Sequence, residues 1–346
     1  MKNPYLDKPD TSFWKKAVAQ QEWLQMIPIS ESLHLISRDM NISAAGSCFA
    51  QKVASYIKSN DVVNFLELES VSQGQPLYSA KYGNIYTTRQ LYELIREAES
   101  DCVDETCAVR RDDGRYVDVF RPFVEDDGYE TEEAVIHERS HHLGKVRQMF
   151  RESDVFVFTL GLTEAWISEE TGRTFPVCPA IYTDDVTSTF VNYNYEEVCS
   201  DLKLCVETIT AINPDIKIIV TVSPVPLTAT YTDQHVMSAT SFSKSVLRTV
   251  CGAVSDSYAN VNYFPSYEIV VNPFRDGLAF EENMRSVKKE VVDQVMNAFQ
   301  FGFFDHDIQT LEQTTNQKIA LSDQCDISSN DEPICDDVLV EKSVGF

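Results

Sequence analysis

The sequence predicts an α/β fold built on a mostly parallel sheet, and three observations support this prediction. Two continuous apolar runs, 154–160 and 217–222, are rich in β-branched and aromatic residues, as in strands buried on both faces. Segments with the apolar spacing of helices lie between and after these runs, at 141–150, 195–212 and 242–257. Strands that alternate with helices in this order are typical of a parallel sheet.

The composition indicates a globular protein with a strong excess of acidic residues. The chain has 346 residues and a formal net charge of −25, which argues against a nucleic-acid backbone or an anionic membrane as the main partner. Nine cysteines are scattered without the spacing of a metal site. The chain shows no signal-peptide core and no apolar run of membrane-spanning length, so we expect a cytoplasmic protein without a metal or cofactor.

Three parts of the chain differ in composition. Residues 1–40 are expected to be a lead-in that packs on the main body, and residues 41–304 to form the α/β domain. A charged stretch at about 99–136 is expected to be an insertion in that domain. Residues 305–346 form an acidic tail that we expect to be flexible, since charge runs of this kind are more often solvated than part of a site.

The first strand of the domain, 41–45, leads into a small-residue turn at Gly46 and Ser47. An apolar face at helical intervals follows, formed by Phe49, Val53, Tyr56 and Ile57. Ser47 is therefore placed to cap a helix, next to exposed backbone amides and the positive end of the helix dipole. A nucleophile whose reaction builds an oxyanion suits the same place, so helix cap and nucleophile are both open interpretations.

The remaining elements follow in order along the chain. They are expected to be a short strand at 62–65, a helix at 89–98, hairpin strands near 116–120, a strand at 261–264 and a closing helix at 286–299. In an open parallel sheet, ligands bind outside the carboxyl ends of the strands. Four loops should meet there: those at Ser47, at 161–164, at 223–235 and at 266–285. The Gly83-Asn84 turn is a candidate fifth.

Several sequence blocks resemble one known family. Residues 46–50 spell Gly-Ser-Cys-Phe-Ala, the motif for which the GSCFA family is named, and further blocks resemble that family at 82–87, 158–166, 222–227, 235–248 and 263–268. The resemblance covers roughly residues 40–300. The GSCFA family is in turn similar to the SGNH (GDSL-like) hydrolases, which have a three-layer α/β/α flavodoxin-like fold.

This resemblance implies roles for particular residues. Ser47 matches the nucleophilic serine, and Gly83, with Asn84 beside it, matches the oxyanion glycine. Gly161 begins the block that stands for Gly-x-Asn-Asp, but Thr163 replaces its asparagine. A hydroxyl or the Asn84 amide would then donate to the oxyanion instead.

The late block, which in SGNH hydrolases supplies an Asp-x-x-His pair, departs from the pattern. Residues 280–286 contain no histidine, and Arg285 cannot act as a base because its guanidinium group does not lose its proton. His235 is the candidate base, since it follows a strand-end loop and lies in a block that resembles the family. Its orienting carboxylate is expected to be Glu164, Asp233 or Glu268.

The other histidines are expected to serve no catalytic role. His34 precedes the core and His306 follows it, while His137, His141 and His142 lie in a charged region and are expected at the surface.

Three cationic residues and one cysteine have alternative interpretations. Lys244 and Arg248 share a helical face and, with Arg285, are candidates to bind an anionic group, although a solvated face explains the first two equally well. Cys48 follows Ser47 at a helix N-terminus, where thiols become reactive, but we expect it to face the core.

Two classes of function remain open. The first is an SGNH-like serine esterase or O-acyltransferase that acts on an acylated small molecule or carbohydrate, with Ser47, His235 and Glu164 as catalytic residues. The second is a non-hydrolytic carbohydrate- or anion-binding protein, or a sugar-transfer protein, on a degenerate SGNH fold. The missing histidine of the late block favours the second class. No feature identifies a protein partner for the acidic tail.

Overall fold

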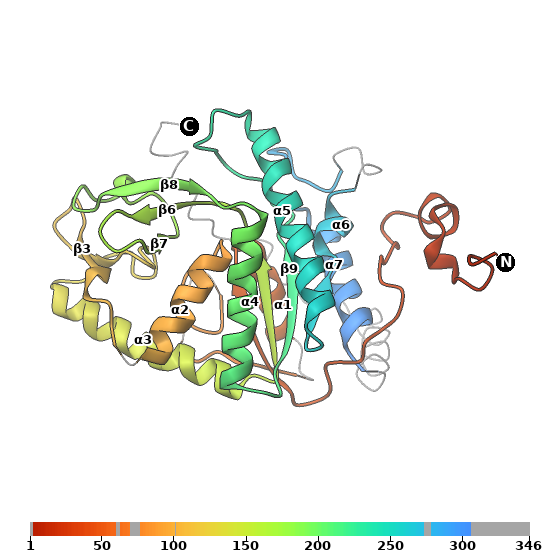
Figure 1. Ribbon diagram of the computed structural model, residues 1–346, viewed down its shortest axis with the longest axis horizontal. Helices are drawn as coiled ribbons and strands as arrows, with labels where there is room; N and C mark the ends of the chain where they lie inside the picture. The colour runs from red at the N-terminus through yellow and green to blue at the C-terminus, as the bar shows by residue number, and fades with distance from the viewer. Residues whose placement is uncertain (1–2, 60–62, 70–76, 101, 273–277, 306–346) are drawn as a thin grey trace, which may run out of the picture. The chain divides into compact units, whose positions relative to one another are not determined.

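Five strands form one sheet whose order identifies the fold (Figure 1). The strands are β1 (Asn41–Gly46), β2 (Asn64–Phe65), β5 (Val155–Leu160), β9 (Lys217–Val222) and β10 (Val261–Phe264). The sheet order is β10-β9-β5-β1-β2, and the pairs β1–β2, β1–β5 and β5–β9 are parallel. If the five strands are renumbered 1 to 5 in chain order and the sheet is read from β2 to β10, the order is 2-1-3-4-5, which is the flavodoxin-like order. The predicted parallel α/β sheet is confirmed.

The computed structural model describes residues 3–59, 63–69, 77–100, 102–272 and 278–305. The expected acidic tail, except for Asp305, and with it His306, lies outside the described residues. Contacts divide the described chain into two compact units, one made of residues 39–263 and the other of residues up to 38 together with those from 264 onward.

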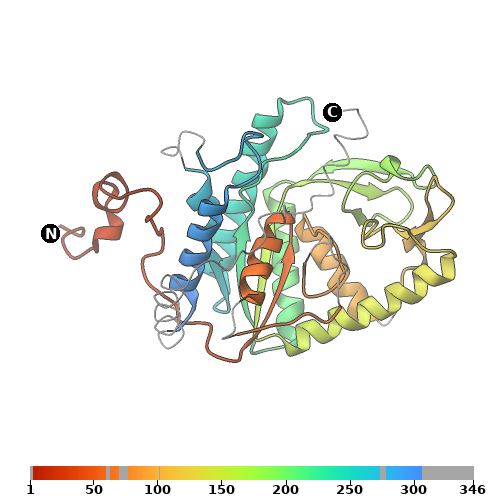
Figure 2. The same cartoon turned by 180° about the vertical axis from the view of Figure 1, so that it is seen from behind.

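Helices cover both faces of the sheet in the unit of residues 39–263. In Figure 1 α4 (Tyr195–Ile212) lies in front of the strands, between α2 (Thr88–Ser100) and α5 (Val236–Ser257). Figure 2 shows the opposite face, where α1 (Cys48–Lys58) lies in front. All six residues of β5 are buried, as expected for a strand between two helical layers.

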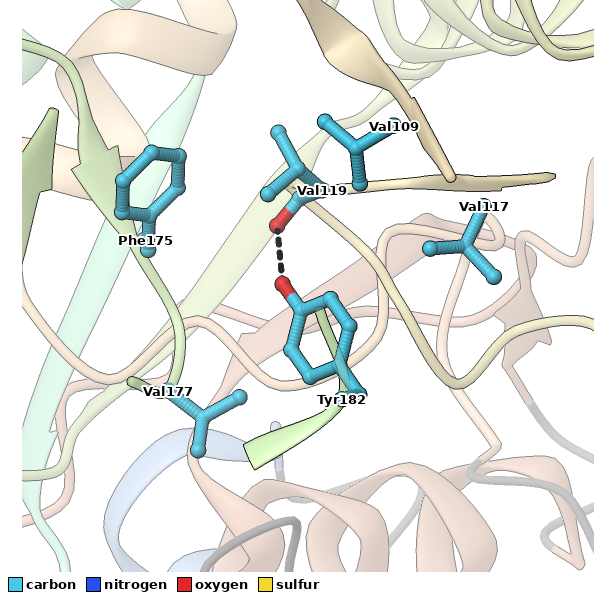
Figure 3. Packing of buried hydrophobic residues seen from close by; sticks show 6 residues of the cluster. All are labelled: Val109, Val117, Val119, Phe175, Val177 and Tyr182. Carbon is cyan, nitrogen blue, oxygen red and sulfur yellow. Dashed lines mark hydrogen bonds between the residues drawn. The ribbon is translucent and has the colours of Figure 1, made fainter. Parts of the chain in front are cut away.

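A second group of elements packs beside the large sheet. They are η3 (Glu105–Cys107), β3 (Ala108–Arg110), β4 (Tyr116–Asp118), α3 (Glu132–Glu152), β6 (Glu164–Ser168), β7 (Thr174–Phe175), η4 (Pro179–Ile181) and β8 (Ser188–Asn192). Strands β3 and β4 pair as a hairpin, and β7, β6 and β8 form a three-stranded sheet. Six side chains from strands β3, β4 and β7 and from the segments that follow them form a small core, and the Tyr182 hydroxyl donates to the carbonyl of Val119 at 3.5 Å (Figure 3).

Helix α3 begins nine residues before the start of the expected segment 141–150. Thr131 caps its first turn by accepting a hydrogen bond from the amide of Ala134, and Glu132 and Glu133 lie at the positive end of its dipole. Its inward face includes Val135 and the charged Arg139, so apolar spacing alone does not reveal this first part of the helix.

The second unit has its own elements. They are η1 (Asp10–Ser12), η2 (Lys15–Ala19), α6 (Ser266–Val270) and α7 (Lys289–Phe303). The N-terminal segment is tied to α7, since Leu33 donates to the carbonyl of Gly302 and Ile36 to that of Phe303, both at 2.8 Å.

A buried ionic cluster lies between α2, α3 and β4. Arg139 of α3 is 1 % exposed and forms ion pairs with Glu97 of α2 and, at 2.9 Å, with Asp118 of β4. Arg121 binds Asp118 from the other side at 2.7 Å. Burial alone would raise the pKa of Asp118, but the charges of Arg139 and Arg121 lower it to about 2. Each buried charge is thus compensated by the others.

The variant Arg139→Met tests this cluster. It removes the shared cation and leaves two buried carboxylates without their main partner, so we expect the free energy of unfolding to fall by about 3–5 kcal/mol. Urea denaturation of the full chain measures the change. The control is Arg151→Met in the exposed last turn of the same helix, which should stay within about 0.5 kcal/mol of the wild type. Equal losses in both variants would contradict the ionic role of Arg139.

Candidate functional site

The turn between β1 and α1 depends on close contact with β5. Gly46 has φ +139°, and a Cβ atom there would lie 2.4 Å from the carbonyl oxygen of Thr159. The next amide, that of Ser47, donates to the same carbonyl at 3.0 Å. Only glycine combines this backbone conformation with this approach, so Gly46 places Ser47 at the carboxyl ends of the two strands.

The Ser47 hydroxyl does not cap the helix that it precedes. Ser47 occupies the N-cap position of α1, but its side chain makes no capping hydrogen bond. Oγ is buried and has no hydrogen-bond partner among the described residues. The amides of Cys48 and Phe49 likewise find no acceptor in that part of the chain. Ser47 and the two residues after it thus have one hydroxyl and two amides without a hydrogen-bond partner among the described residues.

Gly161 lies against Ser47 at the end of β5. A Cβ atom on Gly161 would lie 2.9 Å from Cβ of Ser47, so a larger residue would displace the serine. The Gly161 amide donates to the carbonyl of Tyr86 at 2.9 Å, and its carbonyl accepts a 2.6 Å hydrogen bond from Nζ of Lys244. Lys244 is 2 % exposed, so it does not lie on a solvated helix face.

Asn84 is connected to Ser47 through a tyrosine. The Tyr78 hydroxyl lies 2.5 Å from Oδ1 of Asn84 and 3.1 Å from the carbonyl of Ser47. Oδ1 of Asn84 also accepts a hydrogen bond from Gln51 of α1 at 3.2 Å. Gly83, with φ +69°, presents an amide that has no acceptor among the residues described. The structure thus links Asn84, the neighbour of Gly83, to Ser47 through Tyr78.

Thr163 uses both of its donors within the protein. Its amide donates to Oγ of Ser243 at 3.0 Å, and its hydroxyl donates to Oδ1 of Asn192 at 2.7 Å. The Thr163 hydroxyl is therefore not free for an oxyanion in this structure. Asn192 is the residue that sequence reasoning missed, because only the pairing of β6 with β8 places it beside Thr163.

The side chains of His235 and Glu164 form hydrogen bonds with residues other than Ser47. His235 is the exposed N-cap of α5, and its Nδ1 accepts a hydrogen bond from the amide of Met237 at 3.2 Å. Glu164 binds the hydroxyl of Thr230 at 2.6 Å and the amide of Tyr231 at 3.1 Å. No hydrogen bond joins Ser47, His235 and Glu164 among the described residues.

Other predicted residues occupy varied positions. The Arg248 guanidinium group stacks 4.0 Å from the centroid of the Tyr263 ring. Arg285 belongs to the other compact unit, where its amide donates to Oδ1 of Asn283 at 2.9 Å. Glu268 belongs to that unit too, and Asp233 is exposed. Cys48 is buried, as expected.

The expectation for His142 is wrong. His137 and His141 are exposed, but His142, on the inward face of α3, is completely buried. The charges around it in the sequence hide this burial, because one of them, Arg139, is itself buried in ion pairs with Glu97 and Asp118.

Two further searches of the structure gave negative results. The described residues contain no group of three or more His, Cys, Asp or Glu side chains that could hold a metal ion. In the same part of the chain no helix is both long enough and apolar enough to span a membrane.

Comparisons with known proteins give one family and several solved structures. The model of the GSCFA family matches residues 41–299. A carbohydrate esterase family 3 protein from Talaromyces cellulolyticus is similar at 10 % identity and a TM-score of 0.38, covering 80 % of this chain and 99 % of that chain. The periplasmic domain of a lipopolysaccharide acetyltransferase from Salmonella ser. Paratyphi A is similar at 13 % identity and a TM-score of 0.31, covering 85 % and 96 %. No curated protein matches.

The variant Gly161→Ala tests the contact with Ser47. The new methyl group would overlap Cβ of Ser47 and the Tyr86 ring, so we expect the free energy of unfolding to fall by about 1–3 kcal/mol. Gly144→Ala is the control, because a Cβ there meets nothing within 4 Å and alanine favours the helix by about 0.5–1 kcal/mol. Equal stability of the two variants, measured by urea denaturation, would argue against the close approach.

Proposed function

The chain belongs to the GSCFA family, and we propose that it is a serine esterase or O-acyltransferase in which Ser47 is the nucleophile. The observation that carries this proposal is the state of the Ser47 hydroxyl. It lies at a helix N-terminus that it does not cap, without a hydrogen-bond partner among the described residues. The side-chain oxygen of a serine that only capped the helix would accept a hydrogen bond from a first-turn amide.

The proposed reaction has two stages. In the first, Oγ of Ser47 attacks the carbonyl carbon of an ester, and its proton passes to a base. The ester C–O bond breaks, the leaving alcohol takes that proton, and the acyl group stays on Ser47. In the second, the oxygen of water or of an acceptor hydroxyl attacks the acyl group, and Ser47 recovers its proton. Water gives an esterase and an acceptor alcohol gives a transferase.

The oxyanion donors that we propose are backbone amides at two places. The amide of Cys48, directly after the nucleophile, and that of Gly83 have no acceptor among the described residues, whereas the Ser47 amide is used by Thr159. Donors that are already oriented stabilise developing charge without reorganisation. Asn192, held at Oδ1 by Thr163, is the side chain that we propose in place of the missing asparagine of the family block.

We propose His235 as the base that accepts the Ser47 proton. A neutral imidazole has one donor and one acceptor nitrogen, and Nδ1 of His235 already accepts the Met237 amide. Nε2 therefore carries the proton in this arrangement. To receive the Ser47 proton, the ring must leave its capping position. Ser47, which is 2 % exposed, must also become accessible, so the proposal requires an opening of the site before reaction.

The substrate that we propose is an acylated small molecule or carbohydrate. This class follows from the resemblance of the GSCFA family to SGNH hydrolases, and the residues around Ser47 do not distinguish one acyl group from another.

A second candidate function is binding, or sugar transfer, without an acyl-enzyme. The specific observation that favours it is that Ser47 is buried and that no histidine among the described residues forms a hydrogen bond with its hydroxyl. Such a protein would bind its carbohydrate or anion equally well with alanine at position 47.

Labelling by a fluorophosphonate probe tests the nucleophile. We expect the wild-type chain to be labelled and Ser47→Ala to remain unlabelled, because the probe reacts only with an activated serine. Ser55→Ala, which changes an exposed serine on the same helix, should label like the wild type. Mass spectrometry of the intact protein measures the adduct. A wild-type chain that stays unlabelled while folded would favour the binding function.

Two substitutions at position 235 separate the base from the helix cap. His235→Asn keeps a good N-cap but removes the imidazole, so we expect labelling to slow by about 10²–10⁴-fold with unchanged stability. His235→Ala removes both functions and should also lose about 0.5–2 kcal/mol of stability. If His235→Asn is labelled at the wild-type rate, His235 is a cap and the base lies elsewhere.

A further inference from the structure

A small polar cavity lies beside the Gly83-Asn84 turn. It has a volume of about 30 Å³, and Asn84, Arg121 and His142 are among the residues that line it. A cavity needs about 10–15 Å³ of this kind to hold one water molecule. The site therefore has room for one or two water molecules and for nothing much larger.

Two buried side chains hold both backbone polar groups of Lys81, two residues before Gly83. The Lys81 amide donates to Oε2 of Glu69 at 2.9 Å. The Lys81 carbonyl accepts a hydrogen bond from Nη1 of Arg121 at 3.1 Å. Arg121 is itself fixed by Asp118, and both side chains are almost completely buried. We call Glu69, Arg121 and His142 the Lys81 clamp.

His142 completes this clamp by binding Glu69. Its Nδ1 lies 2.6 Å from Oε2 of Glu69, and both groups are buried. Burial, together with the charge of Arg121, lowers the pKa of His142 to about 4. Burial would raise the pKa of Glu69, but the hydrogen bond and charge interaction with His142 lower it to about 2. At neutral pH the pair is thus a carboxylate and a neutral imidazole whose proton lies on Nδ1.

Two atoms of the clamp have complementary hydrogen-bonding roles, one as a donor and one as an acceptor. Nη2 of Arg121 and Nε2 of His142 are buried without a partner in the described part of the chain. Nη2 can only donate, and Nε2 of this tautomer can only accept. A buried polar atom left without a hydrogen bond destabilises the fold, because it has lost its hydrogen bonds with water. A water molecule can accept from the first atom and donate to the second.

We propose that a buried water molecule bridges Nη2 of Arg121 and Nε2 of His142 and so completes the hydrogen bonds of the Lys81 clamp. The clamp in turn positions the Gly83 amide. The part that concerns Gly83 rests on the proposed function. Glu69, His142 and Arg121 are then positioning residues, because they act on the oxyanion donor through Lys81 and do not touch the reacting atoms. The water and the histidine tautomer do not depend on any activity.

The first test is physical and uses the full chain. In a high-resolution crystal structure at neutral pH, we expect a water within hydrogen-bond distance of both Nη2 of Arg121 and Nε2 of His142. In ¹⁵N-histidine NMR spectra at pH 7, the His142 signal should show a protonated Nδ1 and an unprotonated Nε2. The variant His142→Asn identifies the signal. A protonated Nε2, or two protonated nitrogens, would overturn the proposal, as would a cavity that stays dry in the crystal.

The second test separates positioning from folding. His142→Asn keeps a donor that can replace Nδ1 and leaves room for a second water, whereas His142→Leu removes both hydrogen bonds. We expect His142→Leu to slow fluorophosphonate labelling of Ser47 by about 10- to 100-fold, and His142→Asn to recover most of the wild-type rate. The control is His141→Leu on the exposed neighbour, which should label normally.

The outcomes distinguish this proposal from the proposed function. If the wild-type chain is not labelled, the acyl-transfer function fails, while the crystal structure and the NMR spectra still decide the water and the tautomer. If the wild type is labelled and His142→Leu, folded as judged by its circular dichroism spectrum, reacts at the wild-type rate, the positioning role is overturned.

Discussion

The close approach of β1 to β5 is the constraint on which the rest of the site depends. Two glycines allow it, Gly46 against the backbone of Thr159 and Gly161 against the side chain of Ser47. Because the two strands run parallel, their carboxyl ends meet at one edge of the sheet, and the turn into α1 starts there. The hydroxyl of Ser47 and the first amides of α1 are thereby presented together.

The supports of this turn come from segments far apart in the chain. Tyr78 joins Ser47 to Asn84, and Lys244 of α5 holds the carbonyl of Gly161 from the next layer. The ionic cluster around Arg139 reaches the neighbouring Gly83-Asn84 turn through Arg121, which binds the carbonyl of Lys81. Buried charges are costly unless they are paired, and in this cluster each of them has a partner of opposite charge.

The sheet and the position of Ser47 could be predicted from the sequence because both depend on local patterns. A strand buried on both faces needs a continuous apolar run, as at 155–160, and a tight turn needs glycine at 46. The partners of polar side chains could not be predicted. Thr163 binds Asn192 because β6 pairs with β8, and the buried His142 binds Glu69, which lies 73 residues earlier in the chain.

The same limit explains why no triad can be assembled from the sequence motifs alone. His235 lies in a block that resembles the family, but a backbone amide already occupies its Nδ1. The proposed nucleophile and donors depend on backbone geometry at two turns, whereas the proposed base depends on a side chain whose role requires a change of conformation. The proposed role of Ser47 therefore follows from its place in the turn, whereas that of His235 requires its ring to leave the helix cap.

The most direct measurement of the central claim is the trapping of an acyl-enzyme. The full chain would be mixed with 4-nitrophenyl acetate, quenched in acid and digested, and the peptides analysed by mass spectrometry. The proposed function predicts an acetyl group on Ser47 that disappears as the reaction is allowed to run to completion. Release of 4-nitrophenol by the folded chain without acetylation of Ser47, or no release at all, would contradict it.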